Sequence, residues 1–368
     1  MKNIQLDRDA LLRPLQAVTG VVERRQTLPI LSNVLIESTN GVMTLLATDL
    51  EIQVAAPVTG QRSGDDFAVT VSAKKLLDIL RALPEGTSIA LDQKDSKVQL
   101  KAGRSRFSVQ TLPAADFPRL AAGQQASAEM SVPQNELRAL LGLTQYAMAQ
   151  QDIRYYLNGM LLVVDKNELT LVATDGHRLA LTTRELTDSY VRSEVILPRK
   201  AVLELARLLQ DTDEEVRITL LANQVKFEFS GLQLITKVVD GKFPDYGRVV
   251  PLNYARHFET GRIRLQQALQ RAAILSNEKF RGVRWVLTAG SLRIVCTNTE
   301  QEEAEEEMEI PYSGDDLDVG FNITYLQDVL NSVDTDSVDC AFGDANSSML
   351  VTLPGRSDFK YVVMPMRI

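Results

Sequence analysis

One short segment of the chain carries residue types that can move protons. Asp175 and His177 stand close together between Thr174 and Arg178. A carboxylate beside an imidazole can perform general acid–base catalysis, so this segment could be the centre of a hydrolase. The sequence around it contains no phosphate-binding loop, metal-ligand spacing or nucleophile elbow. We therefore expect no cofactor and no bound metal.

The Thr-Asp pair of this segment belongs to a longer internal repeat. Ala47-Thr48-Asp49 returns as Ala173-Thr174-Asp175, a shift of 126 positions. Phe117-Pro118 returns as Phe243-Pro244 with the same shift. The first copy continues with Leu50 and has no histidine, although it keeps the Thr-Asp pair. We therefore favour a scaffold turn at this place and keep the hydrolase as the alternative hypothesis.

Further landmarks extend the repeat to three units. Lys74, which precedes a leucine-rich segment, returns as Lys200, again after 126 positions. A third and weaker copy has Cys296-Thr297-Asn298 in place of Ala-Thr-Asp. A fixed period of this kind indicates that one structural plan was reused along the chain. We expect three domains, at residues 1–126, 127–254 and 255–368.

The elements that must position these residues recur in the same order in each unit. Apolar residues at helical spacing predict two amphipathic helices per unit, and alternating runs predict strands around them. Asp7 and Ser72 stand where the first two helices would be capped. We expect helices at 8–21, 73–83, 134–148, 199–210, 264–277 and 324–332. In the first unit we expect strands at 34–36, 43–47, 67–71, 88–91, 97–102 and 106–111. The fold class is therefore α+β, with helix pairs packed against curved antiparallel sheets.

The composition of the chain excludes several classes of protein. With 368 residues, of which 45% are hydrophobic, it is long enough for two or three globular domains. The sequence contains no apolar run long enough to span a membrane, and its first residues are not a secretion signal, so we expect a cytoplasmic protein. Cys296 and Cys340 lack metal-ligand spacing and are expected to be reduced and buried.

The charges are unevenly distributed along the chain. The net charge of −8 argues against a protein that holds nucleic acid by bulk attraction. The acidic residues gather in loops and in the run from Glu300 to Glu307, which by itself would be interpreted as a solvated face. Basic residues recur at the start of the second predicted helix of a unit, at Lys74-Lys75 and at Arg199-Lys200. This placement favours one shared basic face on the helices.

Seven stretches of the chain, spread over all three units, carry a recognisable pattern. They are Thr27–Leu31, Ala102–Phe107, Gln151–Met160, Ala173–Leu179, Ala273–Gly282, Gln301–Glu306 and Tyr361–Arg367. In these stretches the chain resembles the bacterial replicative sliding clamps, the beta subunits of DNA polymerase III.

The resemblance implies a fold and a function. The fold would be a head-to-tail homodimer closed into a ring of six similar domains. Such a ring encircles duplex DNA without regard to sequence, confers processivity on the polymerase, and performs no chemistry of its own. The implied partners are the DNA polymerase III alpha subunit, a clamp loader and other proteins that carry a clamp-binding motif, and no membrane is implied.

The resemblance also assigns roles to individual residues. The residues implied to line a protein-binding cleft are Leu157, Thr174, Gly176, His177, Arg178, Leu179, Pro244, Arg248, Val249, Ser348, Val362, Val363, Met364, Pro365 and Met366. The implied DNA contacts are Arg24 or Arg25, Gln151, Tyr155 and Tyr156, and the basic pair Arg199 and Lys200 joins them as a candidate. The implied dimer interface sets Lys75, Arg104, Arg106, Phe107 and Val109 against Ile274, Leu275, Glu300, Glu302, Glu303, Glu305 and Glu306.

Overall fold

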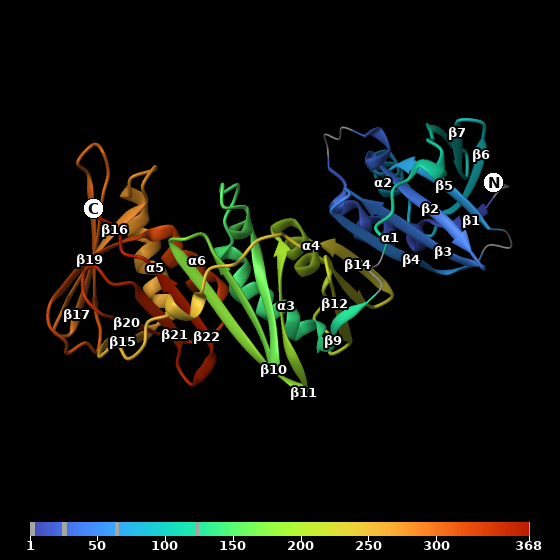
Figure 1. Cartoon of the computed structure of the whole chain (residues 1–368). Coiled ribbons are helices and arrows are strands. Elements are labelled where there is room, and N and C mark those ends of the chain that lie inside the picture. The colour runs from blue at the N-terminus through green and yellow to red at the C-terminus, as the bar shows by residue number, and fades with distance from the viewer. Residues whose placement is uncertain (1–3, 24–27, 63–65, 122–124, 368) are drawn as a thin grey trace. The chain divides into compact units, whose positions relative to one another are not determined.

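The structure is a computed structural model that describes residues 4–23, 28–62, 66–121 and 125–367. By the density of its internal contacts the chain divides into two compact units (Figure 1). These two units are not the repeats of the sequence. The first unit comprises residues 1–137 and 203–238, and the second unit comprises residues 138–202 and 239–368.

Six α-helices occur in the described residues, two in each third of the chain. They are α1 (Arg8–Val18), α2 (Ala73–Ala82), α3 (Gln134–Thr144), α4 (Arg199–Leu208), α5 (Arg262–Ala272) and α6 (Ile323–Ser332). The first helices of the thirds begin at residues 8, 134 and 262, so the starts are 126 and then 128 residues apart. The predicted helix pairs are therefore confirmed.

The helix ends differ from the prediction in their detail. The helices α1, α3 and α5 stop earlier than predicted, because the apolar pattern continues into tighter 3₁₀ turns at Thr19–Val21, Gln145–Ala147 and Ala273–Leu275. Asp7 caps α1 as predicted, since its carboxylate accepts the amide N–H of Asp9 at 2.7 Å. The predicted cap at Ser72 is wrong. The helix α2 begins directly after Ser72, but the Ser72 side chain makes no capping hydrogen bond.

The first unit contains two antiparallel sheets. A four-stranded sheet has the order β1-β6-β7-β8, and an eight-stranded sheet has the order β5-β2-β3-β4-β14-β13-β12-β9. The strands are β1 (Ile4–Asp7), β2 (Asn33–Thr39), β3 (Val42–Thr48), β4 (Ile52–Arg62), β5 (Phe67–Ser72), β6 (Ser88–Lys94), β7 (Lys97–Ala102), β8 (Ser105–Gln110), β9 (Ala126–Pro133), β12 (Glu215–Leu221), β13 (Gln224–Phe229) and β14 (Leu232–Lys237). These bounds confirm the predicted strands of the first third to within a few residues.

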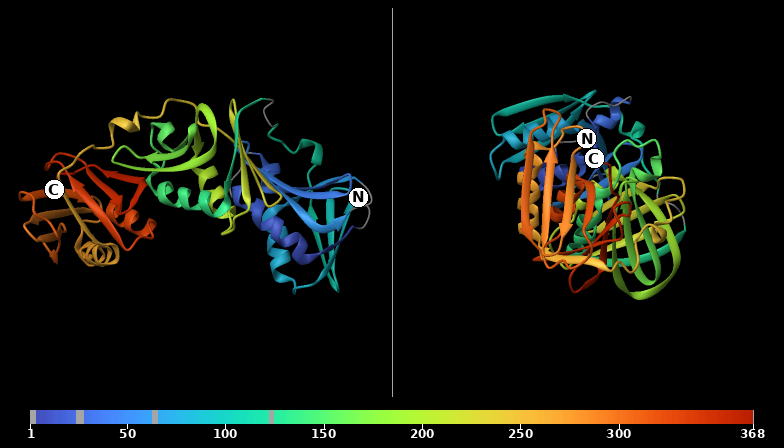
Figure 2. Two further views of the ribbon diagram at one scale, coloured as in Figure 1. Left: turned by 90° about the horizontal axis from the view of Figure 1, so that it is seen from below. Right: turned by 90° about the vertical axis from the view of Figure 1, so that its left-hand side faces the viewer.

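The second unit also contains two antiparallel sheets. A six-stranded sheet has the order β10-β11-β22-β21-β20-β15, and a four-stranded sheet has the order β18-β17-β16-β19. The strands are β10 (Gly159–Thr174), β11 (Arg178–Pro198), β15 (Arg256–Gly261), β16 (Gly282–Thr288), β17 (Ser291–Thr297), β18 (Glu303–Glu309), β19 (Leu317–Asn322), β20 (Ser337–Phe342), β21 (Met349–Leu353) and β22 (Arg356–Val363). The long strands β10 and β11 are drawn in light green in Figure 1 and can be followed in the left view of Figure 2.

The two contact-based units cut through the central repeat instead of following the repeat boundaries. The reason lies in the two large sheets, each of which combines strands from neighbouring repeats. In the first unit β14 of the central repeat pairs with β4. In the second unit β11 of the central repeat pairs with β22. Hydrogen-bonded ladders of this kind produce dense contacts across the positions where the sequence predicts joints.

Two smaller expectations concern the cysteines and the membrane. Cys296 and Cys340 are free and buried, as predicted. Among the described residues, no helix is both long enough and apolar enough to cross a membrane.

Candidate functional site

The run with Asp175 and His177 forms a tight turn between β10 and β11, and we call residues 174–178 the cleft turn. The Thr174 hydroxyl donates to the Arg178 carbonyl at 2.6 Å and accepts the Gly176 amide N–H at 3.1 Å. Asp175 Oδ1 accepts the amide N–H groups of His177 at 2.9 Å and of Arg178 at 3.0 Å. Both side chains therefore satisfy the backbone of their own turn.

The same turn is present in the first third of the chain. The Thr48 hydroxyl donates to the Ile52 carbonyl at 2.8 Å and accepts the Leu50 amide N–H at 3.1 Å. Asp49 Oδ1 accepts the amide N–H groups of Glu51 at 2.9 Å and of Ile52 at 2.8 Å. The turn forms in this way without a histidine, which confirms the prediction of a scaffold turn.

The third copy of the turn uses an amide in place of the carboxylate. Asn298 Oδ1 accepts the amide N–H groups of Glu300 at 2.9 Å and of Glu302 at 3.0 Å. The role of the Asp in the first two copies is therefore to accept hydrogen bonds, which a neutral amide can also do. In the described residues, no three His, Cys, Asp or Glu side chains gather into a potential metal site.

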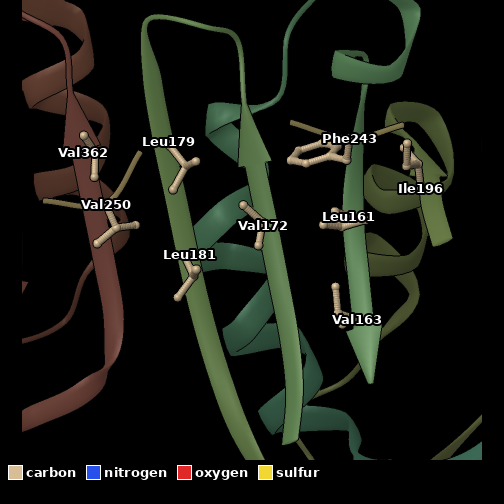
Figure 3. Packing of buried hydrophobic residues seen from close by; sticks show 9 residues of the cluster. All are labelled: Leu161, Val163, Val172, Leu179, Leu181, Ile196, Phe243, Val250 and Val362. Atoms are coloured by element: carbon tan, nitrogen blue, oxygen red, sulfur yellow. The ribbon is translucent and has the colours of Figure 1, made fainter. Parts of the chain in front are cut away.

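An apolar cluster lies beside the cleft turn. It is formed by the buried residues Leu161, Val163, Val172, Leu179, Leu181, Ile196, Phe243, Val250 and Val362. Figure 3 shows these side chains on one face of β10, β11 and β22, with helical segments behind the strands. Phe243 and Val250 come from the segment after β14 and cover the strand residues.

Strand pairing decides which of the implied cleft residues face the apolar cluster. Leu179 pairs with Val362, and both side chains belong to the cluster. The neighbouring pair in the same two strands is Arg178 with Val363. Because successive side chains point to opposite faces of a sheet, Arg178 and Val363 face the other side. The resemblance placed all four in the cleft, and the structure brings two of them together on the side of the cluster.

The remaining implied cleft residues differ in their exposure. Leu157 is buried, whereas Pro244 and Ser348 are half-buried. Val249 is exposed, and so is Arg248, whose guanidinium pairs with Asp245 at 3.0 Å. A set of apolar side chains that is buried at its base and partly exposed at its rim can accept a large apolar side chain from a partner.

The C-terminal segment closes one side of the cleft turn. The Met364 amide N–H donates to the His177 carbonyl at 2.8 Å, which attaches the end of β22 to the turn. The Met366 amide N–H donates to the Gly320 carbonyl at 2.8 Å. The Met364 side chain is 46% exposed, while Pro365 and Met366 are half-buried. An exposed methionine above buried apolar residues is an adaptable surface for a partner.

A second loop, residues 151–157, lies against the cleft turn, and we call it the tyrosine loop. Arg154 forms an ion pair with Asp152 at 2.9 Å and donates to the Asp175 carbonyl at 3.3 Å. Hydrogen bonds from Arg154 lower the pKa of Asp152 to about 2. Gly176 has φ +89°, and a Cβ at this position would lie 2.9 Å from the Arg154 guanidinium. A side chain here would have to displace the Arg154 guanidinium, and its backbone would be strained, although Leu50 occupies the same position of the first-third turn at φ +80°.

The candidate DNA contacts occupy different environments. Arg24 and Arg25 lie outside the described residues. Gln151 is exposed with φ +57°, Tyr155 is 55% exposed, and Tyr156 is half-buried against the apolar cluster. The two tyrosines lie in the 3₁₀ turn Tyr155–Leu157.

The basic pair at the start of α4 is less exposed than the sequence suggested. Arg199 and Lys200 are both half-buried. The Arg199 guanidinium donates to the Met148 carbonyl at 3.2 Å, and burial together with Arg178 lowers its pKa. Arg199 therefore has a structural contact within the chain, whether or not it also contacts DNA.

Two sheet edges carry part of the implied interface. β8, with Arg106, Phe107 and Val109, is the end strand of its sheet, and β18, which begins at Glu303, is the end strand of another. Arg104 and Arg106 are exposed, as are Glu300, Glu302, Glu303 and Glu305. Glu306 is half-buried and forms an ion pair with Arg271 at 2.6 Å, and Glu305 pairs with Arg293 at 3.8 Å.

Two apolar side chains accompany the acidic edge. Ile274 is 77% exposed, and Leu275 is half-buried, in the 3₁₀ turn after α5. On the basic side Lys75 is exposed on α2, and Phe107 and Val109 are half-buried on β8. Exposed edge strands with apolar neighbours are surfaces on which another chain can pair.

The sequence interpretation missed several residues of the site. Phe243 was noticed only as half of a repeated Phe-Pro pair. That signal could have identified it, because Phe117 of the first copy is also buried and packs with Leu35 and Leu46. Arg154 stands within one of the matching stretches but received no role. Its contact with the cleft turn depends on the fold and has no local sequence signal.

Comparison with known proteins places these features in a single family. Three consecutive family models match the chain: the N-terminal domain of the DNA polymerase III beta subunit at residues 2–121, its central domain at 131–245 and its C-terminal domain at 247–367. The beta sliding clamp of Pseudomonas aeruginosa is 48% identical over 364 residues, and that of Escherichia coli K12 is 44% identical over 363 residues. Each alignment covers 99% of both chains.

Solved structures agree with the sequence comparisons. The crystal structure of the DNA polymerase III subunit beta from Pseudomonas aeruginosa is similar with a TM-score of 0.96, at 47% identity and complete coverage of both chains. The pol III beta of Caulobacter crescentus is similar with a TM-score of 0.94 at 36% identity, again over the whole of both chains.

The fold is thus that of a three-domain clamp, in which one plan of two helices and antiparallel sheets occurs three times in a row. The chain belongs to the DNA polymerase III beta subunit family, the bacterial beta sliding clamps.

Proposed function

We propose that two copies of this chain close head to tail into a ring of six domains that encircles duplex DNA and slides along it. The ring tethers the replicative polymerase and so confers processivity. The observation that carries the proposal is the threefold repeat, which the three family models match in order along the chain. We place the domain boundaries at residues 1–126, 127–254 and 255–368.

The charge distribution supports retention by topology. The chain has a net charge of −8, which opposes tight nonspecific binding to DNA. A closed ring does not need strong contacts, and strong contacts would slow sliding. Loose phosphate contacts carry no sequence information, which suits a clamp that works at any sequence. Arg24 or Arg25, Gln151, Tyr155, Tyr156, Arg199 and Lys200 are the residues that we assign to such contacts.

The two exposed sheet edges support head-to-tail closure. One edge is basic at Arg104 and Arg106, and the other is acidic at Glu303 and Glu305. A head-to-tail contact joins two different patches, so opposite charges on different edges of one chain suit it. Ile274 and Leu275 would pack against Phe107 and Val109, and Lys75 would add to the basic side, with Glu300, Glu302 and Glu306 on the acidic side.

The cleft is the surface that we assign to client proteins. Its partners would be the polymerase III alpha subunit, the clamp loader and other proteins with a clamp-binding motif. A client would insert a short peptide with large apolar side chains beside the apolar cluster, and burial of each such side chain contributes about 1.5–3 kcal/mol. The chain would act in the cytoplasm without chemistry of its own.

The alternative hydrolase lacks support in the geometry. The Asp175 carboxylate accepts two backbone N–H groups of the cleft turn and pairs with Arg178 at 3.1 Å. A general base needs a lone pair free for its proton. The first-third turn has the same hydrogen bonds without a histidine, which favours the structural role.

A primer-extension assay tests the proposed function. The polymerase core is given a long primed circular template with the clamp loader and ATP, with and without this protein. We expect product lengths to increase strongly when the protein is present, at a polymerase concentration too low for rebinding. Unchanged product lengths, with a loader that is active on another clamp, would refute the proposal.

A further inference from the structure

The arginine of the cleft turn points away from the apolar cluster. Leu179 and Leu181 belong to the cluster, so Arg178 and Ala180 face the opposite side of β11. Only 9% of Arg178 is exposed. Its charged group is therefore buried behind the sheet that forms the cleft floor.

Behind the sheet, the Arg178 guanidinium is held from three directions. It pairs with Asp328 of α6 at 2.6 Å, donates to the Tyr146 carbonyl at 2.6 Å, and pairs with Asp175 of its own turn at 3.1 Å. It also lies over the Tyr325 ring of α6, 4.3 Å from the ring centroid. One side chain thus joins the cleft turn to α6 and to the turn after α3.

The surroundings of this arginine are closed and aromatic. Tyr361 of β22 donates its hydroxyl hydrogen to the Tyr325 carbonyl at 2.9 Å, and its ring lies 5.7 Å from the Tyr146 ring. Burial opposes the charge of Arg178, but Tyr361, Asp328 and Asp175 outweigh it and raise the pKa of the guanidinium. The group therefore remains a cation, and removal of that cation would leave two carboxylates without it.

The first third of the chain supplies an internal control. The residue that corresponds to Arg178 after the shift of 126 positions is Ile52. The turn that ends at Ile52 has the same four hydrogen bonds as the cleft turn. The turn can therefore form without an arginine. What the arginine adds in the central third is the connection to α6.

We propose that Arg178 is a positioning residue of the cleft, which fixes the cleft turn against α6 and does not itself touch the bound peptide. The His177 carbonyl that receives the Met364 amide N–H is part of this turn, so the position of the C-terminal wall also depends on Arg178. This inference rests on the proposed function, in which the cleft binds client peptides.

The test replaces Arg178 and measures peptide affinity in the full-length protein. The variant Arg178→Ile copies the first-third turn, Arg178→Lys keeps the charge without the planar fork, and Asp328→Ala removes the partner on α6. The probe is a synthetic peptide that copies the clamp-binding segment of the polymerase III alpha subunit. Arg217→Ile is the matched control, because Arg217 of β12 is an exposed arginine that pairs with Glu129 at 3.7 Å and has no part in the implied cleft.

We expect Arg178→Ile to weaken peptide binding at least tenfold and Arg178→Lys to weaken it less, while Arg217→Ile binds as the wild type does. Asp328→Ala should also weaken binding, and the double variant Arg178→Ile with Asp328→Ala should lose less than the product of the two single losses. Hydrogen exchange at the Met364 amide should accelerate in Arg178→Ile, which a general loss of stability would not produce selectively.

Two results would overturn the inference. One is wild-type affinity in a folded Arg178→Ile protein. The other is wild-type affinity in Asp328→Ala, a variant that decides the question even if Arg178→Ile fails to fold. If the proposed function itself is wrong, the wild-type protein will not bind the peptide, and this result distinguishes that failure from a failure of the inference.

Discussion

Truncation of the two apolar residues after α5 should separate the ring into monomers. Ile274→Ala with Leu275→Ala removes three carbon atoms from each side chain, and loss of burial costs about 0.8 kcal/mol per carbon. We therefore take a loss of about 2 kcal/mol in the free energy of dimerisation for each truncated side chain. A ring has two copies of the interface, so four truncations weaken the dimer by about 8 kcal/mol, which is roughly 10⁵–10⁶-fold in its dissociation constant.

The structure explains why this variant should still fold. Ile274 is 77% exposed in the single chain, so its truncation removes little of the chain's own core. Val191→Ala is the matched control, because Val191 is 85% exposed and lies outside the implied interface. The far-UV circular dichroism of both variants should equal that of the wild type.

Sedimentation of a labelled protein at nanomolar concentration is the decisive assay. The wild type and Val191→Ala should sediment at twice 40.8 kDa, and the double variant should sediment at 40.8 kDa. A double variant that remains dimeric at nanomolar concentration would refute the placement of the interface at Ile274 and Leu275.

Three further predictions concern the cleft turn, the C-terminal segment and the cysteines. Deletion of Met364–Ile368 removes the cleft wall that is bonded to His177, and the truncated chain should still dimerise but lose client-peptide binding in calorimetry; wild-type affinity would place the cleft elsewhere. His177→Gln should reduce peptide affinity moderately, whereas a fall of orders of magnitude in hydrolytic turnover would favour the hydrolase. Burial raises the pKa of the Cys296 thiol to about 11 and raises that of Cys340 further, so both should resist a thiol reagent at pH 8 in the folded protein and react after denaturation; rapid reaction of the native protein would contradict this.

The repeat made much of the fold predictable from the sequence. A shift of 126 positions aligned the helix starts and the Thr-Asp turns, and local patterns determine both of these features. The Thr174 and Asp175 side chains bond to the backbone of their own turn, as Thr48 and Asp49 do, so comparison with Thr48 and Asp49 was enough to predict a scaffold role.

Long-range packing set the features that the sequence could not predict. The resemblance placed Arg178 and Val363 in the cleft, but strand register turns both toward the opposite face of the sheet. Register between β11 and β22 depends on pairing across more than 150 residues of chain, and a shift of one residue would exchange the two faces. The ion pair between Glu306 and Arg271 depends on the packing of β18 beside α5 in the same way.

Retention on closed and on open DNA tests the encirclement of DNA most directly. The protein is loaded onto nicked circular DNA with a clamp loader and ATP, and the complex is isolated by gel filtration at a salt concentration that strips ordinary DNA-binding proteins, whose affinity falls roughly 10³–10⁵-fold between about 50 and about 200 mM salt. A restriction enzyme then linearises half of the sample. We predict that the protein remains on the circles and leaves the linear molecules through their ends. Equal retention on circular and linear DNA would contradict the account.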